Sequence, residues 1–197
     1  MKRLTVLPMV VILLLSSFPS LSRAADLVFD VLPGTILANT KADAFSVTGP
    51  GGREEVSLVS LLPMAAVGIS IPQPEGYIDL KAGAGLLLNG ALDSFMVYGI
   101  AGWYQEMRPG LLIGPHAGIT YFTAPDWWGD DEITFSDSVG FLAGVHIAAG
   151  DRIAYLLSID YVSVAFDVAS QPDGVTTSDR TLDMSGIAVQ FGIRAQF

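Results

Sequence analysis

The last fourteen residues of the chain alternate strictly between two kinds of side chain. From Met184 to Phe197 they read MSGIAVQFGIRAQF. Every second position from Ile187 onward is apolar, whereas the positions between them are small or polar and include Gln190 and Arg194. Successive side chains of a β-strand point to opposite faces, so the pattern predicts a strand with one apolar and one polar face.

The remaining sequence is apolar, yet beyond residue 24 it contains no apolar run of helix length. Hydrophobic residues make up 51% of the chain and charged residues only 15%, which is an apolar balance for a soluble domain. A membrane-spanning helix needs about 18 consecutive apolar residues or more. Glycines interrupt the best candidates, at Gly83, Gly85, Gly99, Gly102, Gly114, Gly118, Gly140 and Gly144. High hydrophobicity without long runs is what the alternating strands of a membrane β-barrel produce.

Eight strand-like stretches follow one another after the first 25 residues. An even number of strands fits a closed up-and-down barrel. We therefore predict an all-β fold, an eight-stranded antiparallel up-and-down transmembrane β-barrel, with no second domain. The stretches are residues 26–37, 56–71, 77–89, 95–107, 111–124, 138–149, 153–168 and 184–197.

The connections between these stretches differ in length and so predict the orientation. Residues 72–76, 108–110 and 150–152 form short connections, which are typical of periplasmic turns. The connections after the first, fifth and seventh strands are long and are expected outside the cell, and that around 91–94 is tight. In the first external loop, we expect a hairpin around 49–52 in which Phe45 and Val47 pair with Val56 and Leu58.

Two local features complicate the strand assignment. Pro33, Pro63 and Pro115 fall inside predicted strands, where each removes a hydrogen-bond donor, so we expect bulges or strand breaks there. In the fourth strand both faces are lipophilic. We place Trp103 outward and Tyr104 inward.

The N-terminal segment has the features of a cleaved secretory signal. Lys2 and Arg3 precede an apolar run over 4–15, and Ser22-Arg23-Ala24 is a small-x-small site. The sequence thus predicts a signal peptide at 1–24 and a barrel domain at 25–197. The chain has no cysteine, which excludes lipoprotein anchoring, disulfides and thiolate chemistry.

The alternating last strand, which ends on Phe197, resembles the closing strand of bacterial outer-membrane β-barrels. In that class the terminal Phe is the signal read by the barrel assembly machinery. The size and layout are similar to small barrels of the OmpA, OmpX and OmpW type. The resemblance implies a location in the bacterial cell outer membrane, contact with outer-membrane lipid and lipopolysaccharide, no cofactor, and a monomer.

The charge of the expected mature chain argues against one class of partner. Without residues 1–24 the chain retains seven basic and twenty acidic residues, a net charge of −13. Such a surface repels phosphate backbones, so nucleic-acid binding is not expected.

Ionisable side chains gather on the predicted inward faces, where an eight-stranded barrel has just enough room for side chains. We expect a polar plug in which these groups satisfy one another, with a proton or ion path as the alternative. Asp30 and Arg194 lie at the closing seam and should pair, and Glu106 should lie opposite Asp79. The expected lumen network comprises Asp30, Asp79, Lys81, Glu106, His116, His146, Asp160 and Arg194.

The two histidines are equidistant from the centre of the loop that joins their strands. His116 and His146 should therefore lie side by side on the lumen wall. Two imidazoles could bind a metal ion or respond to pH, but no third ligand is evident. The sequence favours histidines that are hydrogen-bonded within the plug, and no metal site is expected.

The third external loop is dense in carboxylates. It reads Asp126-Trp127-Trp128-Gly129-Asp130-Asp131-Glu132, and Asp137 follows. Such oxygens can hold Ca²⁺ or bridge lipopolysaccharide through divalent ions, but their spacing matches no EF-hand. The sequence favours a solvated loop whose tryptophans rest at the membrane interface.

Two barrel families that modify lipid A provide an enzyme hypothesis. Their motifs pair a histidine with a nearby serine, but Ala117-Gly118 follows His116 and Ile147-Ala148 follows His146. Asp93-Ser94 is an acid-serine pair in an expected external loop, without a histidine nearby. We therefore expect no enzyme, but a structural or surface-interaction barrel with acidic external loops. A narrow channel for small or hydrophobic solutes is the first alternative and a lipid A-modifying enzyme the second.

Overall fold

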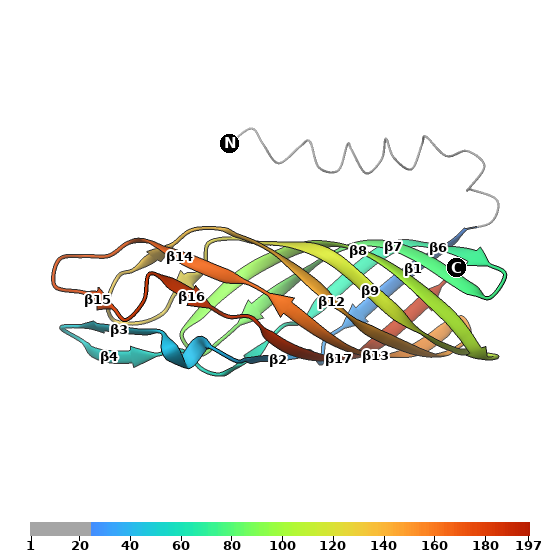
Figure 1. Cartoon of the computed structure of the whole chain (residues 1–197), viewed down its shortest axis with the longest axis horizontal. Helices are drawn as coiled ribbons and strands as arrows, with labels where there is room; N and C mark the ends of the chain where they lie inside the picture. Colours follow the sequence, from blue (N-terminus) through green and yellow to red (C-terminus); the bar gives the residue numbers. More distant parts are fainter. Residues whose placement is uncertain (1–24) are drawn as a thin grey trace, which may run out of the picture.

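The chain forms a single closed β-barrel with a long extension at one end (Figure 1). The computed structural model describes residues 25–197, so the expected signal peptide at 1–24 lies outside the described residues. The barrel strands, in spatial order, are β1 (Asp26–Leu32), β6 (Met64–Gln73), β7 (Gly76–Leu88), β8 (Leu92–Arg108), β9 (Leu111–Phe122), β12 (Ser138–Gly150), β13 (Ile153–Ser163) and β17 (Gly186–Gln196). Neighbouring strands are antiparallel, and β17 pairs with β1 to close the cylinder. The predicted eight-stranded fold is confirmed. Among the described residues, no helix is long and apolar enough to cross a membrane.

The long connections fold into ordered structure at the end of the barrel away from Phe197 (Figure 1). We call residues 40–57, 123–137 and 164–185 the cap, and the opposite end, with its short connections, the turn end. Strands β2 (Ile36–Asn39) and β5 (Val59–Leu61) extend the barrel wall toward the cap, and a short 3₁₀ helix (η2) spans Ala42–Ala44. The cap strands are β3 (Ser46–Gly49), β4 (Gly52–Glu55), β10 (Asp126–Trp127), β11 (Thr134–Phe135), β14 (Ala165–Ser170), β15 (Thr176–Thr177) and β16 (Thr181–Asp183).

The three prolines have different consequences for the wall. Strand pairing is interrupted at 33–35, between β1 and β2, and at 62–63, between β5 and β6, as predicted. The first break is a bulge, because the six-residue step from Asp30 to Ile36 faces a five-residue step from Arg194 to Val189. The prediction of a break at Pro115 is wrong. Pro115 stays inside β9 opposite Val145, and the register continues past it.

The outward face of the barrel carries the predicted apolar side chains. In β17, Ile187, Phe191 and Ile193 are exposed. In β8, Trp103 is exposed while Tyr104 is buried, which resolves the two-faced fourth strand as predicted. Each strand therefore turns one apolar face outward, as membrane barrels do.

Two predictions about the loops need correction. The expected hairpin around 49–52 is present, but Val47 faces Glu54 and Ser46 faces Glu55, so Val56 and Leu58 take no part in it. The second external connection is only residues 89–91, because β8 begins at Leu92 rather than near 95.

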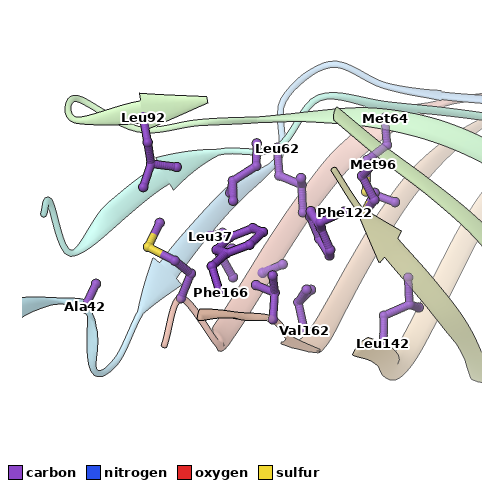
Figure 2. Packing of buried hydrophobic residues seen from close by; sticks show 14 of the residues in the cluster. Leu37, Ala42, Leu62, Met64, Leu92, Met96, Phe122, Leu142, Val162 and Phe166 are labelled. Carbon is purple, nitrogen blue, oxygen red and sulfur yellow. The ribbon is translucent and has the colours of Figure 1, made fainter. Parts of the chain in front are cut away.

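Apolar side chains fill the interior from the middle of the barrel into the cap (Figure 2). Leu37, Leu62, Phe122 and Phe166 are completely buried and come from both ends of the chain. Farther into the cap, Phe135 packs against Phe45 and Trp127, with ring centroids 5.9 and 6.1 Å away. The cap thus has its own apolar core that continues into the barrel.

Candidate functional site

The turn-end half of the lumen holds a cluster of charged side chains centred on Asp30. Its carboxylate accepts hydrogen bonds from Nε and Nη2 of Arg194, at 2.9 and 3.0 Å, and from Nζ of Lys81 at 2.7 Å. Asp30 and Arg194 are directly opposite each other across the seam between β1 and β17. The predicted pair is therefore present, and it joins the first and last strands of the barrel.

Asp79 on β7 brings a second carboxylate to the same arginine. Its Oδ2 lies 2.8 Å from Nη2 of Arg194 and 3.9 Å from Nζ of Lys81. Neither Asp79 oxygen has a donor in hydrogen-bond geometry among the described residues, so the contact with Arg194 is an ion pair only. Two carboxylates and two permanent cations therefore lie together in a space closed to solvent.

Tyr104 covers this charge cluster and was not predicted as part of it. Its ring centroid lies 5.7 Å from Cζ of Arg194 and 5.8 Å from Nζ of Lys81, within the range of cation–π contacts. The ring folds over Gly102 on its own strand, where an added Cβ would collide with it. The glycine two positions before an inward aromatic residue is the sequence signal that could have located it.

The histidines form a second group, next to the first. His116 Nε2 lies 2.6 Å from Oδ1 of Asp160, and the Ser158 hydroxyl donates to Oδ2 of Asp160 at 2.8 Å. Gly144 lies between His116 and Asp160, paired with each across its two neighbouring strands. Because a side chain at Gly144 would collide with the Asp160 carboxylate, this glycine allows the two groups to meet.

His146 links the two groups. Its ring centroid lies 5.9 Å from that of His116 and 5.2 Å from that of Tyr104. The two imidazoles are neighbours, although they are diagonal in the register rather than directly opposite. No set of three His, Asp or Glu side chains in residues 25–197 is arranged to hold a metal ion, so the pair has no further ligand of these types.

Glu106 is the one predicted lumen residue that the structure places elsewhere. It is exposed at the turn end, where its Oε1 accepts a hydrogen bond from the Gly110 N–H. Asp79 faces Gly102 instead. The prediction was wrong because it assumed a connection centred near residue 92, whereas the hairpin turns at 89–91 and the register moves by four residues.

Seven barrel strands contribute to the completed site, which we call the lumen charge cluster. It extends across β1, β7, β8, β9, β12, β13 and β17 and thereby ties most of the barrel wall together. Seven of the eight predicted residues lie in it, and its members are Asp30, Asp79, Lys81, Tyr104, His116, His146, Ser158, Asp160 and Arg194.

A small cavity separates this cluster from the apolar core of the lumen. Its volume is about 20 Å³, and Lys81, His146, Leu32, Met64 and Leu142 are among its lining residues. A space of this size holds about one water molecule. The junction between the two halves of the lumen is therefore packed too closely for a solute.

The acid-serine pair considered for catalysis lies in a strand and not in a loop. Asp93 and Ser94 belong to β8, and Ser94 is buried. Its hydroxyl donates to the Thr123 carbonyl at 2.7 Å rather than to a basic side chain. A serine nucleophile needs a base within hydrogen-bond reach, and Ser94 has none in this arrangement.

Known proteins resemble the chain in fold. A scan of protein-family models and a search of curated proteins find no match. Among solved structures, the outer membrane protein OprG from Pseudomonas aeruginosa aligns with 88% of this chain and 96% of its own, at 11% identity and a TM-score of 0.53. A major outer membrane protein from Thermus thermophilus covers 87% and 99% at 10% identity (TM-score 0.49), and Neisserial surface protein A covers 88% and 97% at 12% identity (TM-score 0.44). In fold, the chain therefore resembles small outer-membrane β-barrel proteins.

Proposed function

We propose that the chain is an integral protein of the bacterial outer membrane. The support is the continuous apolar outer face of the barrel combined with a closed backbone, since a lipid environment leaves no free strand edge unsatisfied. Phe197 exchanges backbone hydrogen bonds with Leu27 at the seam, where the expected assembly signal completes the cylinder. The signal peptide at 1–24, recognition by the barrel assembly machinery, contact with lipid and lipopolysaccharide, and a monomeric state belong to the same proposal.

Its role is structural or surface-directed, with a lumen that is closed by its own side chains. The filling of the interior carries this proposal: the lumen charge cluster occupies one half, the apolar core occupies the other, and a cavity of about 20 Å³ lies between them. Beyond the barrel, the cap carries twelve acidic and three basic residues. An ordered acidic cap at the cell surface suits interaction with the surroundings rather than passage through the lumen.

Planar-bilayer recording of the refolded protein tests this role. A closed lumen should give no discrete current steps, with folding verified independently by circular dichroism. Steps that change in size when Asp30 is replaced by Asn would contradict the plug and favour an ion path. The exposed Glu106→Gln is the matched control, because its side chain lies outside the lumen.

A narrow route for small hydrophobic solutes is the second candidate, and the wall breaks favour it. The interruptions at 33–35 and 62–63 lie on neighbouring strands, and apolar Leu37 and Leu62 lie directly behind them. Solute entry through the wall would predict faster uptake of a hydrophobic dye into vesicles that contain the barrel, without ionic current. A lipid A-modifying enzyme remains the third candidate, and it would shift lipid A mass on expression, with the shift lost in Ser94→Ala.

A further inference from the structure

Two segments of the cap that are far apart in sequence bring their carboxylates together. The tip of the β3–β4 hairpin lies against residues 128–132 of the third external loop. The Asp130 N–H donates to Oε1 of Glu54 at 2.8 Å, across 76 positions of sequence. Cβ atoms added at Gly49 and Gly51 would press on the side chains of Asp131 and Asp130, respectively. The hairpin is glycine-rich at the places where these carboxylates approach it.

No basic side chain balances this group among residues 25–197. In the cap, Arg53 pairs with Glu55 at 3.1 Å and Lys41 with Asp183 at 3.2 Å. Neither cation therefore forms an ion pair with Asp130 or Asp131. The two neighbouring carboxylates repel each other unless another positive charge lies close by.

Asp131 makes the imbalance costly. Its side chain is only 8% exposed, and Oδ2 is fully shielded without a hydrogen-bond donor in the described part of the chain. A buried carboxylate without a partner loses its hydration and gains nothing in return, which destabilises a fold by several kcal/mol. Asp137 on the same loop is different, because it accepts hydrogen bonds from Tyr121 and from the Ala124 N–H.

We propose that Asp131 and Asp130 bind a divalent cation, with Ca²⁺ the best fit, between the third loop and the β3–β4 hairpin tip. No three acidic or histidine side chains in 25–197 converge closely enough to hold an ion alone. The ion therefore takes two carboxylates and completes its shell with backbone carbonyls and water, which Ca²⁺ accepts in a flexible six- to eight-fold arrangement. Glu54 positions the loop through the Asp130 N–H. The site extends the proposed surface role but does not depend on a closed lumen.

Calorimetric titration of the refolded full barrel with CaCl₂, in lipopolysaccharide-free detergent, tests the site. Wild-type protein should bind one Ca²⁺ with a Kd of about 0.1–1 mM, the range of extracellular sites. Asp131→Asn should weaken binding at least about tenfold. Asp173→Asn, at an exposed loop tip, is the matched control and should stay within about twofold. Absence of saturable binding to wild type, or unchanged binding by Asp131→Asn, would overturn the proposal.

Thermal unfolding separates ion binding from a general packing effect. Calcium should raise the melting temperature of wild type and of Asp173→Asn but not that of Asp131→Asn. Without calcium, Asp131→Asn should be at least as stable as wild type, because it removes a buried charge while keeping the shape. If Asp131→Asn does not fold, Asp130→Asn decides: it must lower calcium affinity for the proposal to stand.

Discussion

The barrel wall and the cap distribute polar and apolar side chains in opposite ways. In β17, Ile187, Phe191 and Ile193 face outward, while Arg194 is buried inside. In the cap, Phe166 of β14 and Leu182 of β16 are fully buried. Asp167 and Asp183, beside them, lie toward the surface. The barrel is apolar outside and charged within at the turn end, whereas the cap is apolar within and acidic outside.

The difference reflects the solvent expected around each region. Lipid around the barrel satisfies apolar side chains, so charges must find partners in the lumen. Water around the cap reverses the preference, and the cap folds around a core as soluble domains do. Because the two interiors meet in the middle of the barrel, one chain uses ion pairing to fill one half of the lumen and hydrophobic packing to fill the other.

The strongest disruption of the charged half should come from Arg194→Met. It leaves the buried carboxylates of Asp30 and Asp79 without their shared partner, and removal of one member of a buried pair costs about 3–5 kcal/mol. We expect the upper end of that range, measured by urea unfolding in lipid vesicles. Arg180→Met, at an exposed cap position, should change stability by less than about 0.5 kcal/mol. Equal losses in the two variants would mean that the lumen charge cluster does not hold the barrel together.

Leu37→Ala tests the apolar half. The side chain is completely buried where the barrel meets the cap, so its truncation leaves a cavity and should cost about 3 kcal/mol. Hydrogen exchange should show faster opening of the cap, while the turn end stays protected. Leu58→Ala is the matched control, because Leu58 is 46% exposed and its truncation should cost less than about 1 kcal/mol. Uniform loss of protection along the whole barrel would argue against two separately stabilised halves.

The sequence predicted the barrel more fully than it predicted the cap. Strand alternation depends on local side chains, so the outward faces, the seam pair Asp30–Arg194 and two of the three proline breaks could be read from it. The prediction at Pro115 failed because the register continues through a strand whose proline lacks only its own N–H.

Register and packing at long range could not be read in the same way. Glu106 was misplaced because a change in the turn of one hairpin shifts every later pair. Trp127 was expected at a membrane interface, but it packs against Phe135 inside the cap, while Trp128 is exposed. Such contacts join loops that are distant in sequence, and alternation within one strand carries no information about them.

A smaller effect is expected where the charged half depends on a missing side chain. At Gly144 an added methyl group would collide with the Asp160 carboxylate and the Ile159 carbonyl. Gly144→Ala should therefore push His116 and Asp160 apart and cost about 2 kcal/mol, as overpacking of a filled interior does. Gly90→Ala is the control, since nothing lies within 4 Å of an added Cβ there. Equal stability of both variants in urea unfolding would show that the wall accommodates the methyl group without disturbing the cluster.

The smallest expected effect lies at the polar surface of the cap. The Tyr121 hydroxyl and the Ala124 N–H donate to the Asp137 carboxylate, and these hydrogen bonds lower the pKa of Asp137. A lowered folded-state pKa stabilises the fold above the unfolded value of about 4, and the benefit disappears as pH falls through the folded-state pKa. Tyr121→Phe should thus cost less than about 1 kcal/mol at neutral pH, and the difference from wild type should shrink on acidification below about pH 4. Tyr155→Phe, an exposed tyrosine on the barrel wall, should show no such pH dependence. A difference that grew with acid would mean that the hydroxyl supports the fold by a route other than the ionised carboxylate.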